Sequence, residues 1–224
     1  MKFILTSCSL FFSAFFVMGQ NQVGIFAGAH ANSARYLVFN QEQEVTMKAG
    51  FHAGVNMKVP FEGNLYFNPS VFYSMKGYDV KLTSFTNPPD IRAINNSTTI
   101  HTFELAPMLQ LDLSRNPGHF FIKAGPSLDF QILGKEKFDL NDGTTISRNM
   151  KWSPVDYGRF AASLIGQFGY ETGGGFMIFA HYSLGEGSIS NADGGPRIRH
   201  RQFGLSIGKY LKNKKIIIDT RNKE

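Results

Sequence analysis

The stretch TMKAGFHAGVNMKV, residues 46–59, decides the fold class because it alternates strictly between two kinds of residue. One set of alternate positions is apolar: Met47, Ala49, Phe51, Ala53, Val55, Met57 and Val59. The other set is small, polar or charged: Lys48, Gly50, His52, Gly54, Asn56 and Lys58. Successive side chains of a β-strand point to opposite faces, so this period of two residues predicts a strand with one apolar and one polar face.

The same period recurs along the rest of the chain. In residues 100–114 the apolar set is Phe103, Leu105, Pro107, Leu109, Leu111 and Leu113. In residues 120–131 it is Phe120, Ile122, Ala124, Pro126, Leu128 and Phe130. Residues 202–208 alternate in the same way, and further strands are expected over residues 23–31, 65–80, 157–170 and 175–184. The sequence therefore predicts eight strands.

Short and long connections alternate between these strands. Three tight links, 60–64 (PFEGN), 114–118 (SRNPG) and 171–174 (ETGG), consist of residues that turn at low cost. The intervening segments are longer and more polar: about 32–45, 81–97, 134–152 and 185–197. We therefore predict an all-β fold, an eight-stranded antiparallel up-and-down transmembrane β-barrel with short periplasmic turns and long extracellular loops. In the third loop, an Asn/Asp-Gly turn between FDL and TTIS predicts a hairpin that stands above the membrane.

A soluble barrel, such as a lipocalin, would show the same alternation with its apolar face turned inward. Two features favour the membrane barrel. Each strand has about ten or more residues, enough to cross a bilayer when tilted, and the polar faces are rich in Gly, Ala and Ser. We therefore expect lipid against the apolar face and a packed polar interior, because eight strands leave no room for an open pore.

Residues 1–20 predict a secretory signal peptide, because Lys2 precedes the apolar runs FIL and LFFSAFFVM and the small residue Gly19. The pattern LTSC ending at Cys8 also matches a lipoprotein signal, but cleavage there would leave too short an apolar run. No later stretch approaches the roughly 20 consecutive apolar residues of a spanning helix. The expected domains are the signal peptide over 1–20, the barrel over 21–211 and a basic periplasmic tail over 212–224.

Composition narrows the chemistry of the mature chain. Cys8 is the only cysteine, so removal of the signal peptide excludes disulfides, thiol chemistry and thiolate metal sites. Removing Lys2 from the net charge of +6 leaves +5, and much of this excess lies between Lys209 and Lys223. We expect such a tail to be solvated or to meet anionic surfaces in the periplasm, and we expect no nucleic-acid partner for an exported barrel.

Five segments resemble the PorT-like outer-membrane β-barrel family of the Bacteroidetes in their order and spacing. They are NPSVFYSMKG (68–77), FELAPMLQLDL (103–113), FIKAGPSLDF (121–130), FAHYSLGEGSI (179–189) and RQFGLSIGKYL (201–211). The resemblance implies an outer-membrane barrel and includes a link to protein secretion, but it implies no single activity. Two positions depart from the family: Ser70 stands where a carboxylate is common, and a tail follows Tyr210 where many barrels end on an aromatic residue.

Charged residues of both signs fall on the predicted inner face: Lys58, Glu104, Asp112, Lys123, Asp129 and Arg159. An isolated buried charge costs several kcal/mol, so we expect a paired structural network across the lumen rather than a proton or ion path. Glu104 and Asp129 are expected to lie near each other across a hairpin, with Lys123 or Arg159 between them. Lys76, which precedes Gly77, is expected at the outer rim.

His181 and Ser183 form a candidate catalytic pair for an alternative function. Their spacing puts both side chains on one strand face, as in outer-membrane lipid A deacylases, but only Glu186 and Asp193 follow closely to orient the histidine. The segment DLNDG (139–143) resembles a calcium loop whose glycine comes one position early and whose last carboxylate is absent. No metal site is expected from it.

The sequence thus favours a non-enzymatic integral outer-membrane protein that acts through its extracellular loops in a structural or interaction role. The alternatives are an outer-membrane lipid A hydrolase that uses His181 and Ser183, and a narrow channel. The expected partners are outer-membrane lipid and lipopolysaccharide, the barrel assembly machinery during insertion, and an outer-membrane or periplasmic protein. No cofactor is expected.

Overall fold

The structure, a computed structural model, describes residues 21–211. Within this range no helix is long and apolar enough to span a bilayer. The eight long strands are β1 (Gln22–Val38), β3 (Glu44–Glu62), β4 (Leu65–Lys81), β5 (Asn95–Asp112), β6 (His119–Asp139), β8 (Phe160–Glu171), β9 (Phe176–Gly185) and β10 (Arg197–Leu211). Two short strands, β2 (Gln41–Glu42) and β7 (Thr145–Asn149), pair with β1 and β6. The predicted signal peptide and the predicted basic tail lie outside the described residues.

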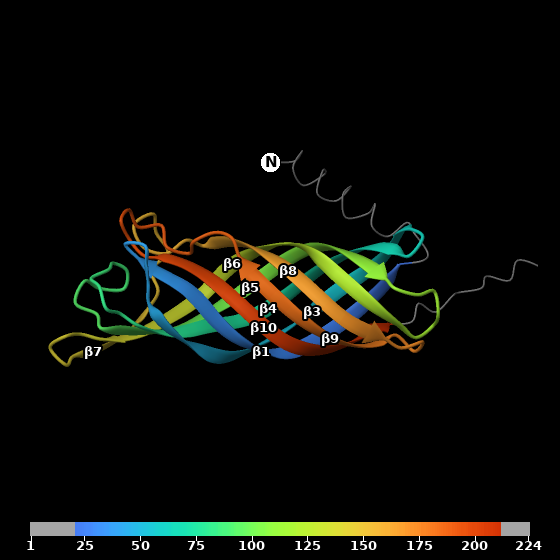
Figure 1. Cartoon of the computed structure of the whole chain (residues 1–224), viewed down its shortest axis with the longest axis horizontal. Helices are drawn as coiled ribbons and strands as arrows, with labels where there is room; N and C mark the ends of the chain where they lie inside the picture. Colours follow the sequence, from blue (N-terminus) through green and yellow to red (C-terminus); the bar gives the residue numbers. More distant parts are fainter. Residues whose placement is uncertain (1–20, 212–224) are drawn as a thin grey trace, which may run out of the picture.

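The eight long strands form one closed antiparallel ring (Figure 1). Strands that follow one another in sequence are neighbours in the ring, in the order β1, β3, β4, β5, β6, β8, β9 and β10. The last strand then pairs with the first, from Val23 opposite Leu211 to Leu37 opposite Arg197. Closure gives hydrogen-bond partners to the strand edges, which lipid cannot do, and it confirms the predicted up-and-down barrel.

Short and long connections lie at opposite ends of the barrel (Figure 1), which we call the turn end and the loop end. At the turn end, β3 joins β4 through Gly63, whose φ of 58° is accessible to glycine at little cost. The loops over residues 82–94 and 186–196 stand at the loop end, close to the predicted positions. β1 starts and β10 finishes at the turn end.

The first outer connection differs from the prediction of a loop over residues 32–45. Instead, β1 continues to Val38 and the chain reverses at Phe39 and Asn40, which have left-handed φ angles of 48° and 64°. Such a pair is typical of a two-residue hairpin turn. The prediction is wrong because outward positions such as Arg35 lie closer to the loop end than the apolar, lipid-facing part of the wall. A strand there needs no apolar outer face.

The third loop contains the hairpin that the sequence predicts. β6 continues to Asp139 and pairs with β7, from Lys135 opposite Asn149 to Asp139 opposite Thr145. Gly143, at the tip, has a φ of 84°. This ribbon extends far out from the loop end (Figure 1).

Side chains alternate between the outer wall and the lumen as predicted. On β5, Phe103, Leu105 and Leu109 are exposed on the outer wall, whereas Glu104 and Gln110 are buried in the lumen. A soluble barrel would place the apolar set inside. The orientation of these side chains therefore identifies the outer wall as the surface that contacts lipid.

The apolar band ends before the strands do. Toward the loop end, outward positions of β10 change from Ile207, Leu205 and Phe203 to Arg201, Arg199 and Arg197. On the adjoining strand, Arg35 lies opposite Arg199. We call Arg35, Arg197, Arg199 and Arg201 the arginine belt. It marks the level at which the hydrocarbon of the bilayer gives way to charged headgroups on the loop side.

Candidate functional site

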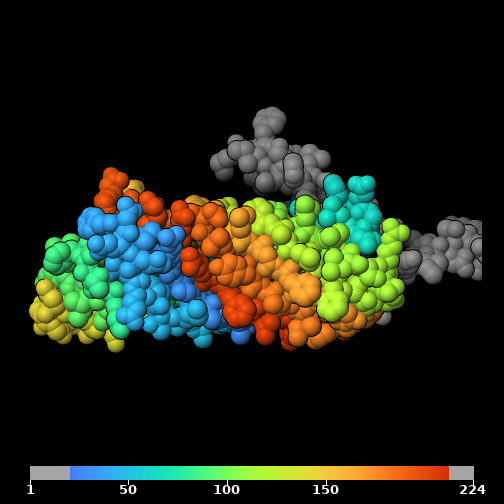
Figure 2. All heavy atoms as spheres, in the orientation of Figure 1, coloured from blue at the N-terminus to red at the C-terminus, as the bar shows by residue number. Residues whose placement is uncertain are grey.

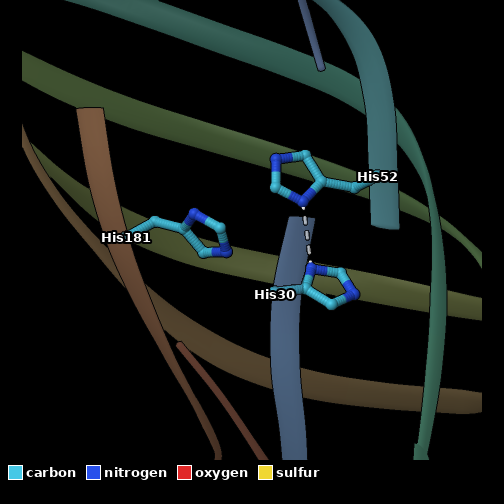
Figure 3. Close-up of side chains that lie close together, drawn as sticks. All are labelled: His30, His52 and His181. Atoms are coloured by element: carbon cyan, nitrogen blue, oxygen red, sulfur yellow. Dashed lines mark hydrogen bonds between the residues drawn. The ribbon is translucent and has the colours of Figure 1, made fainter. Parts of the chain in front are cut away.

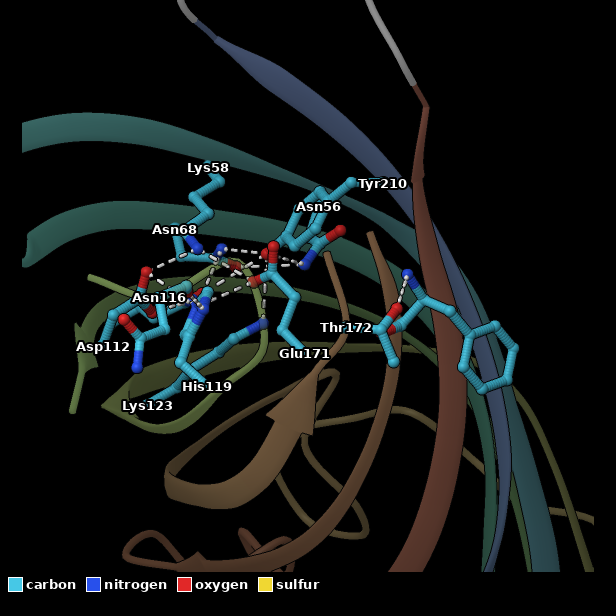
Figure 4. A network of polar contacts seen from close by, with 12 residues as sticks. Asn56, Lys58, Asn68, Asp112, Asn116, His119, Lys123, Glu171, Thr172 and Tyr210 are labelled. Carbon is cyan, nitrogen blue, oxygen red and sulfur yellow. Dashed lines mark hydrogen bonds and ion pairs between the residues drawn. The ribbon is translucent and has the colours of Figure 1, made fainter. Parts of the chain in front are cut away.

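The turn end of the lumen contains an ion cluster built from several strands (Figure 4). Lys58 Nζ of β3 lies 2.6 Å from Asp112 Oδ2 of β5 and 2.8 Å from Glu171 Oε2 of β8. His119 Nε2 lies 3.1 Å from Asp112 Oδ2. We call these four residues the inner ion cluster. Its lysine and both carboxylates are buried, so each charge depends on its partners to offset the loss of water.

A cavity of about 750 Å³ opens between this cluster and the turn end. Its lining includes Lys58, Asp112, His119 and Glu171 together with residues of the turns. The cavity does not continue as a passage through the barrel, because further layers of buried side chains lie beyond it.

The next layer toward the loop end is organised by the Tyr210 hydroxyl (Figure 4). This oxygen accepts a hydrogen bond from Asn68 Nδ2 at 2.9 Å and donates one to Gln110 Oε1 at 3.3 Å. Lys123 Nζ lies 3.5 Å from the same hydroxyl and 4.8 Å from the centre of the Phe121 ring. The ammonium group of Lys123 is thus held by a phenol and aromatic faces.

In the middle of the lumen, Lys76 lies between Glu104 and Asp129. Its Nζ is 2.8 Å from Glu104 Oε1 and 2.8 Å from Asp129 Oδ2. The two carboxylates do lie near each other as expected, but the prediction that Lys123 or Arg159 separates them is wrong. Arg159 is exposed just before β8 and does not face the lumen. Lys76 was expected at the outer rim, but its side chain is buried in the lumen and reaches Glu104 and Asp129.

The predicted pair His181 and Ser183 also faces the lumen, where both side chains are buried. The His181 ring lies 4.7 Å from the His52 ring and 6.0 Å from the His30 ring, between centroids. Its Nδ1 is 3.4 Å from Ser206 Oγ. The pair therefore meets other polar lumen residues, on the side of the wall that faces away from lipid.

The loop end of the lumen is filled by an apolar plug. Its buried members are Ala34, Tyr36, Val38, Tyr78, Val80, Leu82, Ala93, Ile100, Phe138, Leu140, Met150, Tyr157, Ile189 and Ile198. Inside it, Glu136 accepts hydrogen bonds from Arg148 Nε at 2.6 Å and from Tyr157 Oη at 2.8 Å. Burial raises the pKa of Tyr157 well above its usual range, so this phenol remains a donor. The loops consequently rest on a packed floor.

Beyond the apolar plug, the loop tips form an exposed groove of about 440 Å³. Four large apolar side chains line it and are mostly exposed: Phe39 (73%), Phe85 (75%), Ile91 (62%) and Val155 (68%). Figure 2 shows the β1–β3 turn (blue) and the 82–94 loop (green) close together at this end of the molecule. We call this surface the loop groove. The sequence predicted an interaction role for the extracellular loops but did not single out these four residues.

A closed ring with a lipid-facing apolar wall and a lumen blocked by several layers of packed side chains defines an integral outer-membrane β-barrel without an open pore. The sequence agrees with the structure, since the model of the family "Outer membrane protein beta-barrel domain" matches residues 18–191. The chain belongs to this family. Its place is accordingly the outer membrane.

Several solved barrels are similar to this chain at low sequence identity. The attachment invasion locus protein Ail of Yersinia pestis is 12% identical, with 85% of this chain and 99% of that chain covered and a TM-score of 0.45. OprG from Pseudomonas aeruginosa is 10% identical, with 86% and 96% covered and a TM-score of 0.49. Neisserial surface protein A is 12% identical, with 84% and 97% covered and a TM-score of 0.44. Comparison with curated proteins finds no match.

Proposed function

We propose that this protein is a non-enzymatic outer-membrane barrel that binds a protein partner outside the cell through the loop groove. The observation that carries the proposal is the set of exposed apolar side chains at Phe39, Phe85, Ile91 and Val155, which come from three different outer connections. Contiguous apolar surface exposed to water is unfavourable, and on a folded protein it marks an interaction site.

The position of the loop groove supports a protein rather than a lipid as its occupant. Phe39 lies at the tip of the β1–β3 hairpin, farther from the apolar band than Arg35 of the arginine belt. Lipid acyl chains do not reach beyond the headgroup level, so the groove faces the medium. Aromatic side chains surrounded by polar loop residues, among them Asn87 and Asp193, match the anatomy of a protein interface.

The arginine belt supports a fixed position of the loop groove relative to the membrane surface. Arginine binds phosphate groups through a planar fork of donors, so the belt suits the anionic headgroups of outer-leaflet lipid, including lipopolysaccharide. We propose that this contact sets the height of the loops above the membrane. The narrower resemblance to PorT-like barrels remains a prediction, and it makes a protein of a secretion system the first partner to test.

Site-specific crosslinking in living cells tests the proposal. A photoreactive phenylalanine analogue placed at Phe39 or Phe85 should give one discrete crosslinked protein, whereas the same analogue at the lipid-facing, turn-end residue Phe120 should not. The captured protein is identified by mass spectrometry and then added in purified form to the refolded barrel. Binding should be lost in Phe85→Ser and kept in Ile94→Ser, because Ile94 is an exposed apolar residue at the end of the same loop but outside the groove. Equal binding by both variants would contradict the proposal.

A further inference from the structure

Three histidines from different strands meet in the middle of the lumen (Figure 3). His30 belongs to β1, His52 to β3 and His181 to β9, and all three are buried. His30 Nδ1 lies 3.0 Å from His52 Nδ1, and one nitrogen from each ring lies within 4.8 Å of the others. Two nitrogens bound to one tetrahedral zinc ion at about 2.1 Å lie roughly 3.4 Å apart, so the rings are already close to a ligating arrangement.

Glycines on the neighbouring strands make the space for these rings. His30 lies opposite Gly50 on one side and Gly204 on the other, and His52 lies opposite Gly28. A Cβ atom at Gly50 would be 2.5 Å from His30 Nε2, and one at Gly204 would be 2.7 Å from His181 Cε1. Any larger residue at these positions would push the imidazoles apart.

The partners of the outward ring nitrogens suit metal binding. Met75 O lies 3.0 Å from His30 Nε2, and a carbonyl can only accept, so the proton of a neutral His30 is on Nε2 and its Nδ1 lone pair points at His52. Ser206 Oγ lies 2.9 Å from His52 Nε2 and 3.4 Å from His181 Nδ1. A metal-bound imidazole almost always donates its other N–H to an acceptor of this kind. The other nitrogens of the three rings face one another and Gln202, and a bound ion would replace the contacts among them.

Gln202 supplies a fourth group. Its Nε2 contacts His30 Nδ1 and lies 3.5 Å from His181 Nε2, while its Oε1 is buried and has no hydrogen-bond partner among the described residues. Rotating the amide by half a turn would direct this oxygen to the point where the imidazole nitrogens converge. Three neutral imidazoles and one amide oxygen, without thiolate, favour a borderline divalent ion such as Zn²⁺ over Mg²⁺ or Ca²⁺.

The nearest cation to the three histidines is the Lys76 ammonium group, whose repulsion of a bound ion is reduced by its own ion pairs. Lys76 acts electrostatically on the three histidines, but it is paired with two carboxylates, Glu104 and Asp129. Within residues 21–211 one more cluster of this kind, Asp112, His119 and Glu171, already holds the ammonium group of Lys58 at 2.6 and 2.8 Å from two carboxylate oxygens. The Lys58 ammonium group therefore already takes the place of a metal ion in that cluster.

We propose that His30, His52 and His181, with Gln202, bind one Zn²⁺ ion that clamps the closing seam of the barrel. The four residues lie on β9, β10, β1 and β3, which are consecutive in the ring and include the pair of strands that closes it. An ion at this point would link the first strands of the chain to the last. Its role is to stabilise the closed ring.

The test uses the full mature chain with a tag that contains no histidine, refolded in detergent with and without ZnCl₂ because the site is buried. After gel filtration, elemental analysis should find one zinc per folded chain, and folded protein should unfold at a higher temperature with zinc than after chelation. His52→Gln and His181→Gln should weaken zinc binding by roughly 100-fold or more, since loss of even a hydrogen-bonding partner of a ligand costs about 10- to 100-fold. His119→Gln, in the inner ion cluster, should bind zinc like the natural chain.

A second measurement needs no variant. Co²⁺ in place of zinc should give the visible absorption bands of a tetrahedral site in the folded natural chain. Folded protein that retains no zinc and shows no such bands would overturn the proposal. Zinc binding that is unchanged in folded His52→Gln would do so as well.

Discussion

Lys58 Nζ lies 2.6 Å from Asp112 Oδ2 although β4 separates their strands, β3 and β5, in the ring. The two side chains meet because both point into a lumen that is narrow enough for side chains to reach one another. Backbone pairing joins only adjacent strands, whereas this ion pair joins strands that do not touch. The polar contents of the lumen are therefore part of what holds the barrel in one shape.

Loss of Lys58 should destabilise the barrel strongly. Lys58→Ala leaves the buried carboxylates of Asp112 and Glu171 without their cation, and removing one partner of a buried pair costs about 3–5 kcal/mol. The measurement is urea unfolding in phospholipid vesicles, followed by the fluorescence of Trp152, the only tryptophan. Lys81→Ala is the matched control, because the Lys81–Glu44 pair is 70% and 67% exposed and should contribute at most about 1 kcal/mol. Similar losses in both variants would contradict the role given to the inner ion cluster.

The ion group around Lys76 should show non-additive effects. Lys76→Met leaves Glu104 and Asp129 facing each other without a cation, and we expect a loss of about 3–5 kcal/mol. The triple variant Lys76→Met, Glu104→Gln, Asp129→Asn removes all three charges and should recover much of this stability. The same urea titration compares both variants with the natural chain. A triple variant that is less stable than Lys76→Met would show that the ions themselves are required.

Glycines that face the lumen should not tolerate a methyl group. A Cβ at Gly204 would lie 2.4 Å from the Ala29 carbonyl oxygen and 2.6 Å from His30 Cβ. Gly204→Ala should therefore destabilise the barrel by about 1–3 kcal/mol through overpacking. Gly166→Ala serves as the control, since a Cβ there meets no atom within 4 Å. Heat-dependent mobility in gel electrophoresis distinguishes folded from unfolded barrel, and equal behaviour of the two variants would contradict the packed lumen.

The filled lumen should not conduct ions. The inner ion cluster, the layer around Tyr210, the ion group of Lys76, Glu104 and Asp129, and the apolar plug succeed one another along the barrel. In planar bilayers, the purified protein should leave the current at baseline over a wide range of voltages. Reproducible single-channel steps from the natural chain would restore the narrow channel as a function.

The alternation of residues in 46–59 was sufficient to predict the wall of the barrel, because the period of a strand and the orientation of its side chains follow from local geometry. The same alternation does not determine which side chains meet inside the lumen. Which inward side chains meet depends on strand tilt and stagger, and these vary among barrels with the same pattern. For this reason Glu104 and Asp129 were expected close together, while their cation was sought in Lys123 and Arg159 instead of Lys76.

Two buried charged residues, Lys76 and Glu171, were missed because they were not placed on the inner face. Glu171 was assigned to a turn and Lys76 to the rim, so neither was counted among inward positions, although β8 continues to Glu171 and Lys76 lies inside the predicted strand 65–80 with its side chain buried. His30 and His52 were inward positions by the same pattern. Their meeting with His181 required the closing contact between β1 and β10, which no local pattern specifies.

The packed floor beneath the loops also makes this barrel suitable for peptide display. Side chains of the apolar plug, rather than the loop tips, close the outer end, so the tip of the β6–β7 ribbon is not needed to seal it. A foreign epitope inserted between Asp142 and Gly143 would be carried outward on a paired ribbon, with both ends anchored in the same sheet. Antibody binding to whole cells would then report directly how far the ribbon stands above the cell surface.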